Sequence, residues 1–188
     1  MSKRPAEVEY LLIDGYNIIF AWKPLKKIAA YSLDAAREKL ILQTQNYRAF
    51  KAIPGRRFEV IVVFDAHNRP GAGEITRASG ITIVYTKEAE TADTFIERSS
   101  RELVREYGVT VATSDNLEQI IVIGSGAKRV SAEEFHREML DSEKAMRRKL
   151  YSITPIKNNQ LLDNLDESTA ALLEKLRRGE STSGAKND

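Results

Sequence analysis

Three aspartates in this chain each come at or just after the end of a short apolar run. They are Asp14, Asp65 and Asp115. Apolar runs without polar alternation are typical of strands buried on both faces, as in a parallel sheet. Open sheets of this kind place their sites beyond the carboxyl ends of the strands, and the three aspartates would emerge there. The pattern therefore predicts an acidic site at one edge of a sheet.

Two further carboxylates are predicted close to that edge. Asp93 and Glu97 are four residues apart in a segment that Thr91 is suited to cap, so they share one face of a predicted helix. Four or five carboxylates that converge repel one another unless a hard divalent cation neutralises them. Mg²⁺ or Mn²⁺ held in this way orients and activates water for attack on phosphorus. The residues thus indicate metal-dependent phosphodiester chemistry.

Each of these acids also has an ordinary structural interpretation. Asp14 and Asn17 can form an Asx turn, and Asp115 with Glu118 fits a helix cap. Acidic residues in a first helical turn stabilise the helix dipole by about 0.3–1 kcal/mol without any further role. The recurrence at three strand ends is what favours a site. His67, in the loop after Asp65, is a candidate base or ligand, although a lone loop histidine is more often neither.

The elements that must position these residues alternate between strands and helices. Strands are predicted at residues 8–13, 58–64, 81–85, 109–112 and 120–123. Helices are predicted at residues 32–53, from 91 to about 107, and after Ser131, whereas residues 18–28 and the segment around Lys128 are predicted to be loops. Parallel strands joined by right-handed crossovers bring their carboxyl ends to one edge. The predicted fold is an α/β domain.

Composition limits the kinds of site. The chain has 188 residues, 42% of them hydrophobic and 30% charged, with a net charge of +2, no cysteine and two histidines. This suits one domain with a helical appendage, and any metal would have oxygen ligands. Neither a signal peptide nor a membrane span is evident, so we expect a cytoplasmic protein with no membrane partner. The ends of the chain are basic and the middle is acidic, so a polyanion could bind the ends while the middle holds a cation.

Basic residues near the predicted site are candidates for holding a polyanionic substrate. Trp22 stands among lysines, an arrangement that either grips a nucleic-acid strand or is a packed loop. All the candidates are predicted in loops at the carboxyl edge. They are Lys23, Lys26, Lys27, Arg69, Arg77, Lys128 and Arg129. If these residues do not hold the substrate, the basic segment 144–149 is the alternative candidate.

Four short motifs together resemble a known family. They are Ile13-Asp14-Gly15-Tyr16-Asn17, Val63-Phe64-Asp65-Ala66, Thr91-Ala92-Asp93-x-x-Ile96-Glu97 and Thr113-Ser114-Asp115-x-x-Gln119. Their order and spacing over about residues 8–150 resemble the NYN group of PIN-like nucleases, in particular its bacterial and plastid YacP branch. The resemblance implies a three-layer α/β/α sandwich with a central parallel sheet.

The resemblance also implies an activity, which is metal-dependent endoribonuclease cleavage. Members of this branch are associated with the ribosome and with turnover of messenger RNA. By position, Asp14, Asp93 and Asp115 match the acidic motif residues that would bind Mg²⁺ or Mn²⁺ and catalyse cleavage. Asn17, Asp65 and Glu97 would support them.

The chain beyond the motifs is predicted to be separate. We place the nuclease domain at residues 1–150 and a C-terminal helical extension with a disordered tail at residues 151–188. Leucines from Leu161 to Leu176 form an apolar stripe, suited to dock on the domain or on a second copy in a homo-oligomer. Two other functions stay open, namely a non-catalytic RNA- or ribosome-binding module and a nucleotide-binding domain. The second lacks the glycine-rich fingerprint after its first strand.

Overall fold

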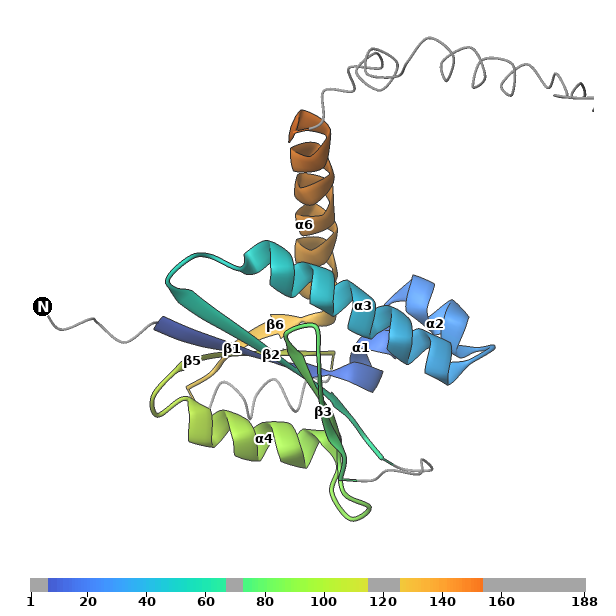
Figure 1. Ribbon diagram of the computed structural model, residues 1–188. Helices are drawn as coiled ribbons and strands as arrows, with labels where there is room; N and C mark the ends of the chain where they lie inside the picture. The colour runs from blue at the N-terminus through green and yellow to red at the C-terminus, as the bar shows by residue number, and fades with distance from the viewer. Residues whose placement is uncertain (1–6, 67–72, 115–125, 154–188) are drawn as a thin grey trace, which may run out of the picture. The chain divides into compact units, whose positions relative to one another are not determined.

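A six-stranded sheet forms the centre of the chain, whose computed structural model describes residues 7–66, 73–114 and 126–153 (Figure 1). The strand order is β3-β4-β2-β1-β5-β6. The strands are β1 (Glu7–Asp14), β2 (Arg56–Phe64), β3 (Ile75–Ala78), β4 (Ile81–Tyr85), β5 (Gly108–Thr113) and β6 (Lys128–Ser131). All neighbouring pairs are parallel except β3 with β4.

The position of β1 in this order is favourable for a site. The chain adds β2 and β4 on one side of β1, and β5 and β6 on the other. The order therefore reverses between β1 and β5, and ligands of open α/β sheets bind outside the carboxyl ends of the strands at such a point. Asp14 is the last residue of β1, so it lies at this reversal.

Five described helices cover the two faces of the sheet. They are α1 (Gly15–Ala21), α2 (Lys23–Ala29), α3 (Leu33–Lys51), α4 (Ala92–Leu103) and α6 (Ala132–Ile153). Figure 1 shows α4 on one face and α3 on the other. Leu11 and Ile13 of β1 pack under α1, α2, α3 and α6, whereas Leu12 packs toward α4. The predicted three-layer α/β/α fold is confirmed.

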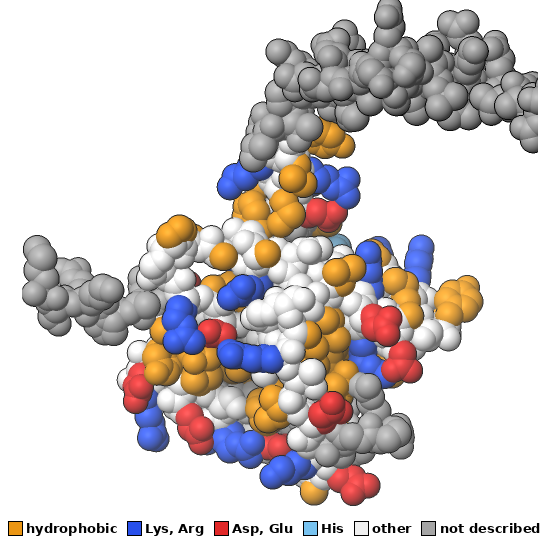
Figure 2. Space-filling model, in the orientation of Figure 1, with side chains coloured by type: hydrophobic (Ala, Val, Ile, Leu, Met, Phe, Trp, Pro, Cys, Tyr) orange, Lys and Arg blue, Asp and Glu red, His pale blue; other side chains and the backbone are white. Residues whose placement is uncertain are grey.

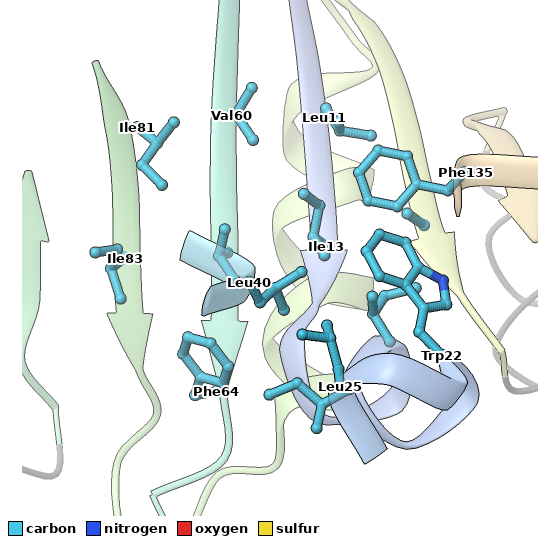
Figure 3. Packing of buried hydrophobic residues seen from close by; sticks show 14 of the residues in the cluster. Leu11, Ile13, Trp22, Leu25, Leu40, Val60, Phe64, Ile81, Ile83 and Phe135 are labelled. Carbon is cyan, nitrogen blue, oxygen red and sulfur yellow. The ribbon is translucent and has the colours of Figure 1, made fainter. Parts of the chain in front are cut away.

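Side chains from several elements fill the first of these two cores. Phe135 of α6, Trp22, Leu25 and Leu40 lie over the sheet, as Figure 3 shows. Trp22 is 3% exposed, and its indole Nε1 donates to the carbonyl oxygen of Ala132 at 2.7 Å. Burial with a satisfied donor makes Trp22 a core residue. The proposal that it grips a nucleic-acid strand by stacking is therefore wrong, and the packed alternative is correct.

Local signals account for the helices that the sequence predicted. Ser32 caps α3 by accepting a hydrogen bond from the backbone of Ala35, and Thr91 caps α4 through Thr94, at 3.2 Å in both cases. At the start of α6, the Ser131 hydroxyl accepts from the backbone of Glu134 while the Glu134 carboxylate accepts from the backbone of Ser131. This reciprocal pair is a capping box. The predicted strands at β1, β2, β4 and β5 are also confirmed.

Four elements differ from the prediction. Residues 18–28 form most of α1 and α2 rather than a loop; Ile18 and Ile19 of α1 and Leu25 of α2 are buried on either side of Trp22, whose extended backbone separates the two helices. The edge strands β3 and β6 were not predicted. Each has four residues and no fully buried position, so neither gives an apolar run. The hairpin joining β3 to β4 has positive φ at Ser79 (48°) and Gly80 (84°), which is the backbone of a tight hairpin turn.

Several predictions concern parts that lie outside the described residues. They are the strand at 120–123, the loop containing His67 and Arg69, Asp115, and the leucine stripe with its tail. The chain divides into two units, Met1–Arg148 and Lys149–Asp188, and the described residues of the second are the end of α6. The predicted boundary at residue 150 stays a prediction. Within the described ranges, no helix is both long and apolar enough to cross a bilayer.

Candidate active site

Asp14 joins the end of β1 to the start of α1. Its side chain is 4% exposed and caps the helix, because its Oδ1 accepts from the backbone N–H of Asn17 at 2.9 Å. Its Oδ2 accepts from Nδ2 of the Asn17 side chain, also at 2.9 Å. The Asx interpretation is therefore correct as local structure. It also fixes both carboxylate oxygens in space.

The turn after Asp14 is packed tightly against the end of β2. A Cβ atom at Gly15 would lie 2.2 Å from Cε1 of Phe64, so only glycine fits there. Phe64 in turn stacks on Tyr85 and meets Tyr16 edge-on, with ring centroids 5.6 and 5.3 Å apart. These contacts hold the first turn of α1, and with it Asp14, in one place.

A buried arginine holds the same turn from α3. Arg37 is 7% exposed, and its Nη1 donates to the hydroxyl of Tyr16 at 2.7 Å. Its other terminal nitrogen forms an ion pair with Asp34. A buried guanidinium needs such partners, because an unpaired charge is costly inside a protein. Arg37 therefore positions Tyr16, two residues from the site carboxylate.

Hydrogen bonds link the ends of β1 and β5 across the strand-order reversal. Ser114 follows β5, and its Oγ donates to Oδ1 of Asn17 at 2.9 Å. Because Oδ1 accepts from Ser114, the Asn17 amide presents its nitrogen to Asp14. The two hydrogen bonds therefore have one donor direction, from Ser114 to Asn17 and from Asn17 to Asp14. They connect two motifs 97 residues apart in sequence.

Burial makes the Asp14 carboxyl harder to ionise. Its pKa is raised to about 6, against an ordinary value of 3.8; loss of solvation is the largest cause, and the Asn17 hydrogen bonds offset only part of the rise. Asp93 contributes to the same rise, by repulsion between the two charges and by a side-chain hydrogen bond that requires one of them to be protonated. The predicted approach of Asp93 to Asp14 is thus found. A cation that bound between them would relieve both effects.

The other predicted acids are placed as follows. Glu97, one turn along α4 from Asp93, forms an ion pair with Arg101 at 2.5 Å. Asp65 is half-buried directly after β2 and has an interaction partner. Asp115 would follow Ser114 but lies outside the described residues.

The donor set fits a hard divalent ion. Among the residues that the structure describes, no group of three or more metal-ligating side chains is found, so the convergence of four or five carboxylates stays a prediction. Mg²⁺, however, is commonly held by one or two carboxylates and several waters. Asp14 and Asp93 would supply two such carboxylates, and an ion there would balance their mutual repulsion, which adds to the effect of burial on the pKa of Asp14.

The basic candidates do not share one location. Lys23, Lys26 and Lys27 are exposed residues of α2, not of a loop. Lys128 and Arg129 lie in β6, level with Thr110 and Val111 of β5, which is short of its carboxyl end. Their predicted loop position is therefore wrong.

Arg77 is also placed differently from the prediction. It lies in β3 opposite Thr82, near the start of β4, and pairs with Glu59 at 3.2 Å. The antiparallel turn of β3 carries it away from the carboxyl edge. Arg69 lies outside the described residues. Whether any of these side chains binds RNA stays a prediction.

Sequence reasoning missed three residues that shape the site. Ser114 stands inside the Thr113-Ser114-Asp115 motif, so its position was a usable signal. Phe64 likewise stands inside the Val63-Phe64-Asp65-Ala66 motif, whereas Arg37 gave no local signal, because its contact with Tyr16 joins two separate helices.

Together these features define an α/β/α domain with an acidic site at the carboxyl edge of a mostly parallel sheet. Residues 11–178 match the model of the YacP-like NYN domain family. The chain is 38% identical over 174 residues to a Bacillus subtilis protein named uncharacterized protein YacP, covering 92% of this chain and 99% of that protein. The chain belongs to the YacP-like NYN domain family.

Solved structures agree with this assignment. The crystal structure of Rae1 (YacP) from Bacillus subtilis matches with a TM-score of 0.65 at 37% identity, covering 94% of this chain and 99% of that one. A mutant of the same protein matches with a TM-score of 0.66 at 35% identity, covering 89% and 99%.

Proposed function

We propose that this protein is a divalent-metal-dependent endoribonuclease. The observation that carries the proposal is the pairing of Asp14 with Asp93 at the carboxyl edge of the sheet, where the pKa of Asp14 is raised to about 6. Strongly perturbed carboxylates in such a place are candidates for functional residues. Membership of the NYN family supports a nuclease-like activity.

The residues have separate roles in the proposal. Asp14 and Asp93, with Asp115 as the third candidate, bind the metal, and Asn17 holds the Asp14 carboxylate in the orientation that binding requires. Bound Mg²⁺ or Mn²⁺ would polarise the scissile phosphate and lower the pKa of water for the attack. Because Oδ1 and Oδ2 of Asp14 are already directed by Asn17, little reorganisation is needed when the cation binds.

The proposal includes the biological setting of the reaction. Messenger RNA is the proposed substrate, and the ribosome is the proposed partner, as the family resemblance implies. A cytoplasmic location belongs to the same proposal, since translated messenger RNA is found there.

Replacement of Asp93 tests the proposed chemistry. Asp93→Asn removes one charge at nearly constant volume from an exposed helix position, so the fold should persist while cleavage falls by at least about 100-fold. Glu102→Gln is the matched control, since Glu102 is an exposed acid of the same helix. Cleavage of labelled RNA would be followed in Mg²⁺, Mn²⁺ and EDTA, with and without translating ribosomes.

The result separates the two candidate functions. A nuclease is supported if the parent cuts RNA only when metal is present, if Glu102→Gln still cuts, and if Asp93→Asn does not. Salt-sensitive RNA or ribosome binding by the parent, without cutting in any metal, would instead support the non-catalytic binding module.

A further inference from the structure

A hollow of about 700 Å³ opens beside the acidic site and carries positive charge. The start of α2, the end of β5, β6 and the start of α6 line it. We call it the Lys23 hollow, and its polar lining comprises Lys23, Ser114, Arg129, Ser131, Glu133 and His136. Its volume lies within the range of about 300–1,000 Å³ that is usual for ligand sites. It can therefore take a nucleotide-sized group.

Ser114 connects the Lys23 hollow to the acidic site. This residue lines the hollow, and its Oγ donates to Asn17, which donates to Asp14. A group in the hollow is thus separated from the site carboxylate by two successive hydrogen bonds. Successive phosphates of a nucleic-acid chain lie only several ångströms apart, so one strand can occupy both places.

The wall of the Lys23 hollow is rigid. Trp22 is buried, stacks on His136 with ring centroids 4.6 Å apart, and donates to the backbone of Ala132. Side chains held in this way keep the hollow in shape before a ligand arrives, which lowers the entropic cost of binding.

The charges around the Lys23 hollow suit a phosphodiester. Lys23 of α2 and Arg129 of β6 are exposed cations in its lining, and Arg129 also interacts with Glu134. Contacts from lysine, arginine and serine to phosphate oxygens are the usual way in which proteins position nucleic acid. Glu133 places one negative charge there, which its ion pair with Arg137 at 3.4 Å only partly offsets.

Cations also line a hollow away from the acidic site, at Lys51, Arg56 and Arg57, and others are visible on the face that Figure 2 shows. Basic and acidic side chains are interspersed over that face. A local set of cations next to the acidic site is therefore a better candidate for binding a polyanion than the net charge of the chain.

We propose that the Lys23 hollow binds the backbone phosphate of the RNA nucleotide next to the one that is cut, through Lys23 and Arg129. This assignment rests on the proposed nuclease function. It also divides the basic candidates, because Lys26 and Lys27 belong to the same helix as Lys23 but do not line the hollow.

Charge reversal at matched positions tests the assignment. Binding of a fluorescently labelled single-stranded RNA to the full chain would be measured by anisotropy in EDTA across a salt series, so that no RNA is cut. Lys23→Glu should weaken binding about tenfold or more at low salt and flatten the salt dependence by about one to two units. Lys26→Glu, an equal change at an exposed position on the same helix, should weaken binding no more than about threefold.

Removing the negative charge should have the opposite effect. Glu133→Gln should tighten RNA binding about twofold to fivefold, since repulsion of the phosphate is relieved. Glu143→Gln is its matched control, because Glu143 pairs with Arg147 in the same i, i+4 arrangement on α6 and does not line the Lys23 hollow. Arg129→Lys should retain more affinity than Arg129→Ala.

Equal effects of Lys23→Glu and Lys26→Glu would overturn the proposal, as would unchanged binding by Glu133→Gln. Melting curves of each variant exclude unfolding as the cause. These binding measurements do not depend on cleavage. If the parent cuts RNA but the variants bind alike, this inference alone fails; if the parent never cuts, the nuclease proposal fails whatever the variants show.

Discussion

The charge of Asp14 should destabilise the metal-free protein at neutral pH. Its pKa of about 6 in the fold, against 3.8 ordinarily, is a rise of about two units, worth about 3 kcal/mol at about 1.4 kcal/mol per unit. Asp14→Asn removes this penalty but also weakens one of the two hydrogen bonds from Asn17, at a cost of about 1 kcal/mol. In EDTA at pH 7.5 the variant should therefore be more stable by about 2 kcal/mol.

The difference in stability between Asp14→Asn and the parent should change with pH in one direction. Because the folded protein holds the Asp14 proton more tightly than the unfolded chain, ionisation takes stability away as the pH rises. The stabilising contribution of the protonated carboxyl is fully present below about pH 4 and is lost between about pH 4 and 6. Near pH 4 the parent should then be about 1 kcal/mol more stable than Asp14→Asn, because it keeps both Asn17 hydrogen bonds.

Urea unfolding of both proteins in EDTA at several pH values from 4 to 8 measures this difference. Asp141→Asn is the control, since it removes the same charge from an exposed position on α6. Mg²⁺ at pH 7.5 should then stabilise the parent and not Asp14→Asn, if the cation binds this carboxylate. A parent-to-variant difference that is constant from pH 4 to 8 would refute the reasoning, because the pKa of Asp14 could not then be raised by the fold.

Two further predictions concern the support of the site. Gly15→Ala should destabilise the fold by about 1–3 kcal/mol, because its Cβ would meet the Phe64 ring at 2.2 Å. Gly108→Ala is the control in the same urea assay, since the nearest contact of its Cβ would be at 3.5 Å. Equal urea midpoints for the two variants would contradict the packing argument. Ser114→Ala should lower kcat for RNA cleavage about 2–10-fold by releasing the Asn17 amide, whereas Ser114→Thr keeps the hydroxyl and most of the rate. An Ala variant with the parent's kcat would remove Ser114 from the positioning of Asp14.

The sequence by itself determined the local structure around the site. Apolar runs ending in acids predicted β1 and β2, and the Ser32, Thr91 and Ser131 caps predicted where three helices begin. These features depend on contacts within a few residues, such as the Asp14–Asn17 hydrogen bonds. Periodicity and capping are local rules, so they can be read from the chain directly.

Tertiary structure decided what the predicted residues do together. The order β2-β1-β5 brings Ser114 to Asn17 across 97 residues, and the packing of α4 on the sheet brings Asp93 to Asp14. Burial at that junction, and not the residue type, raises the pKa of Asp14. Likewise, the short edge strands β3 and β6 exist only through pairing with β4 and β5, and this pairing moved Arg77 away from the carboxyl edge. Pairing and burial are properties of segments that meet in space, so no local pattern encodes them.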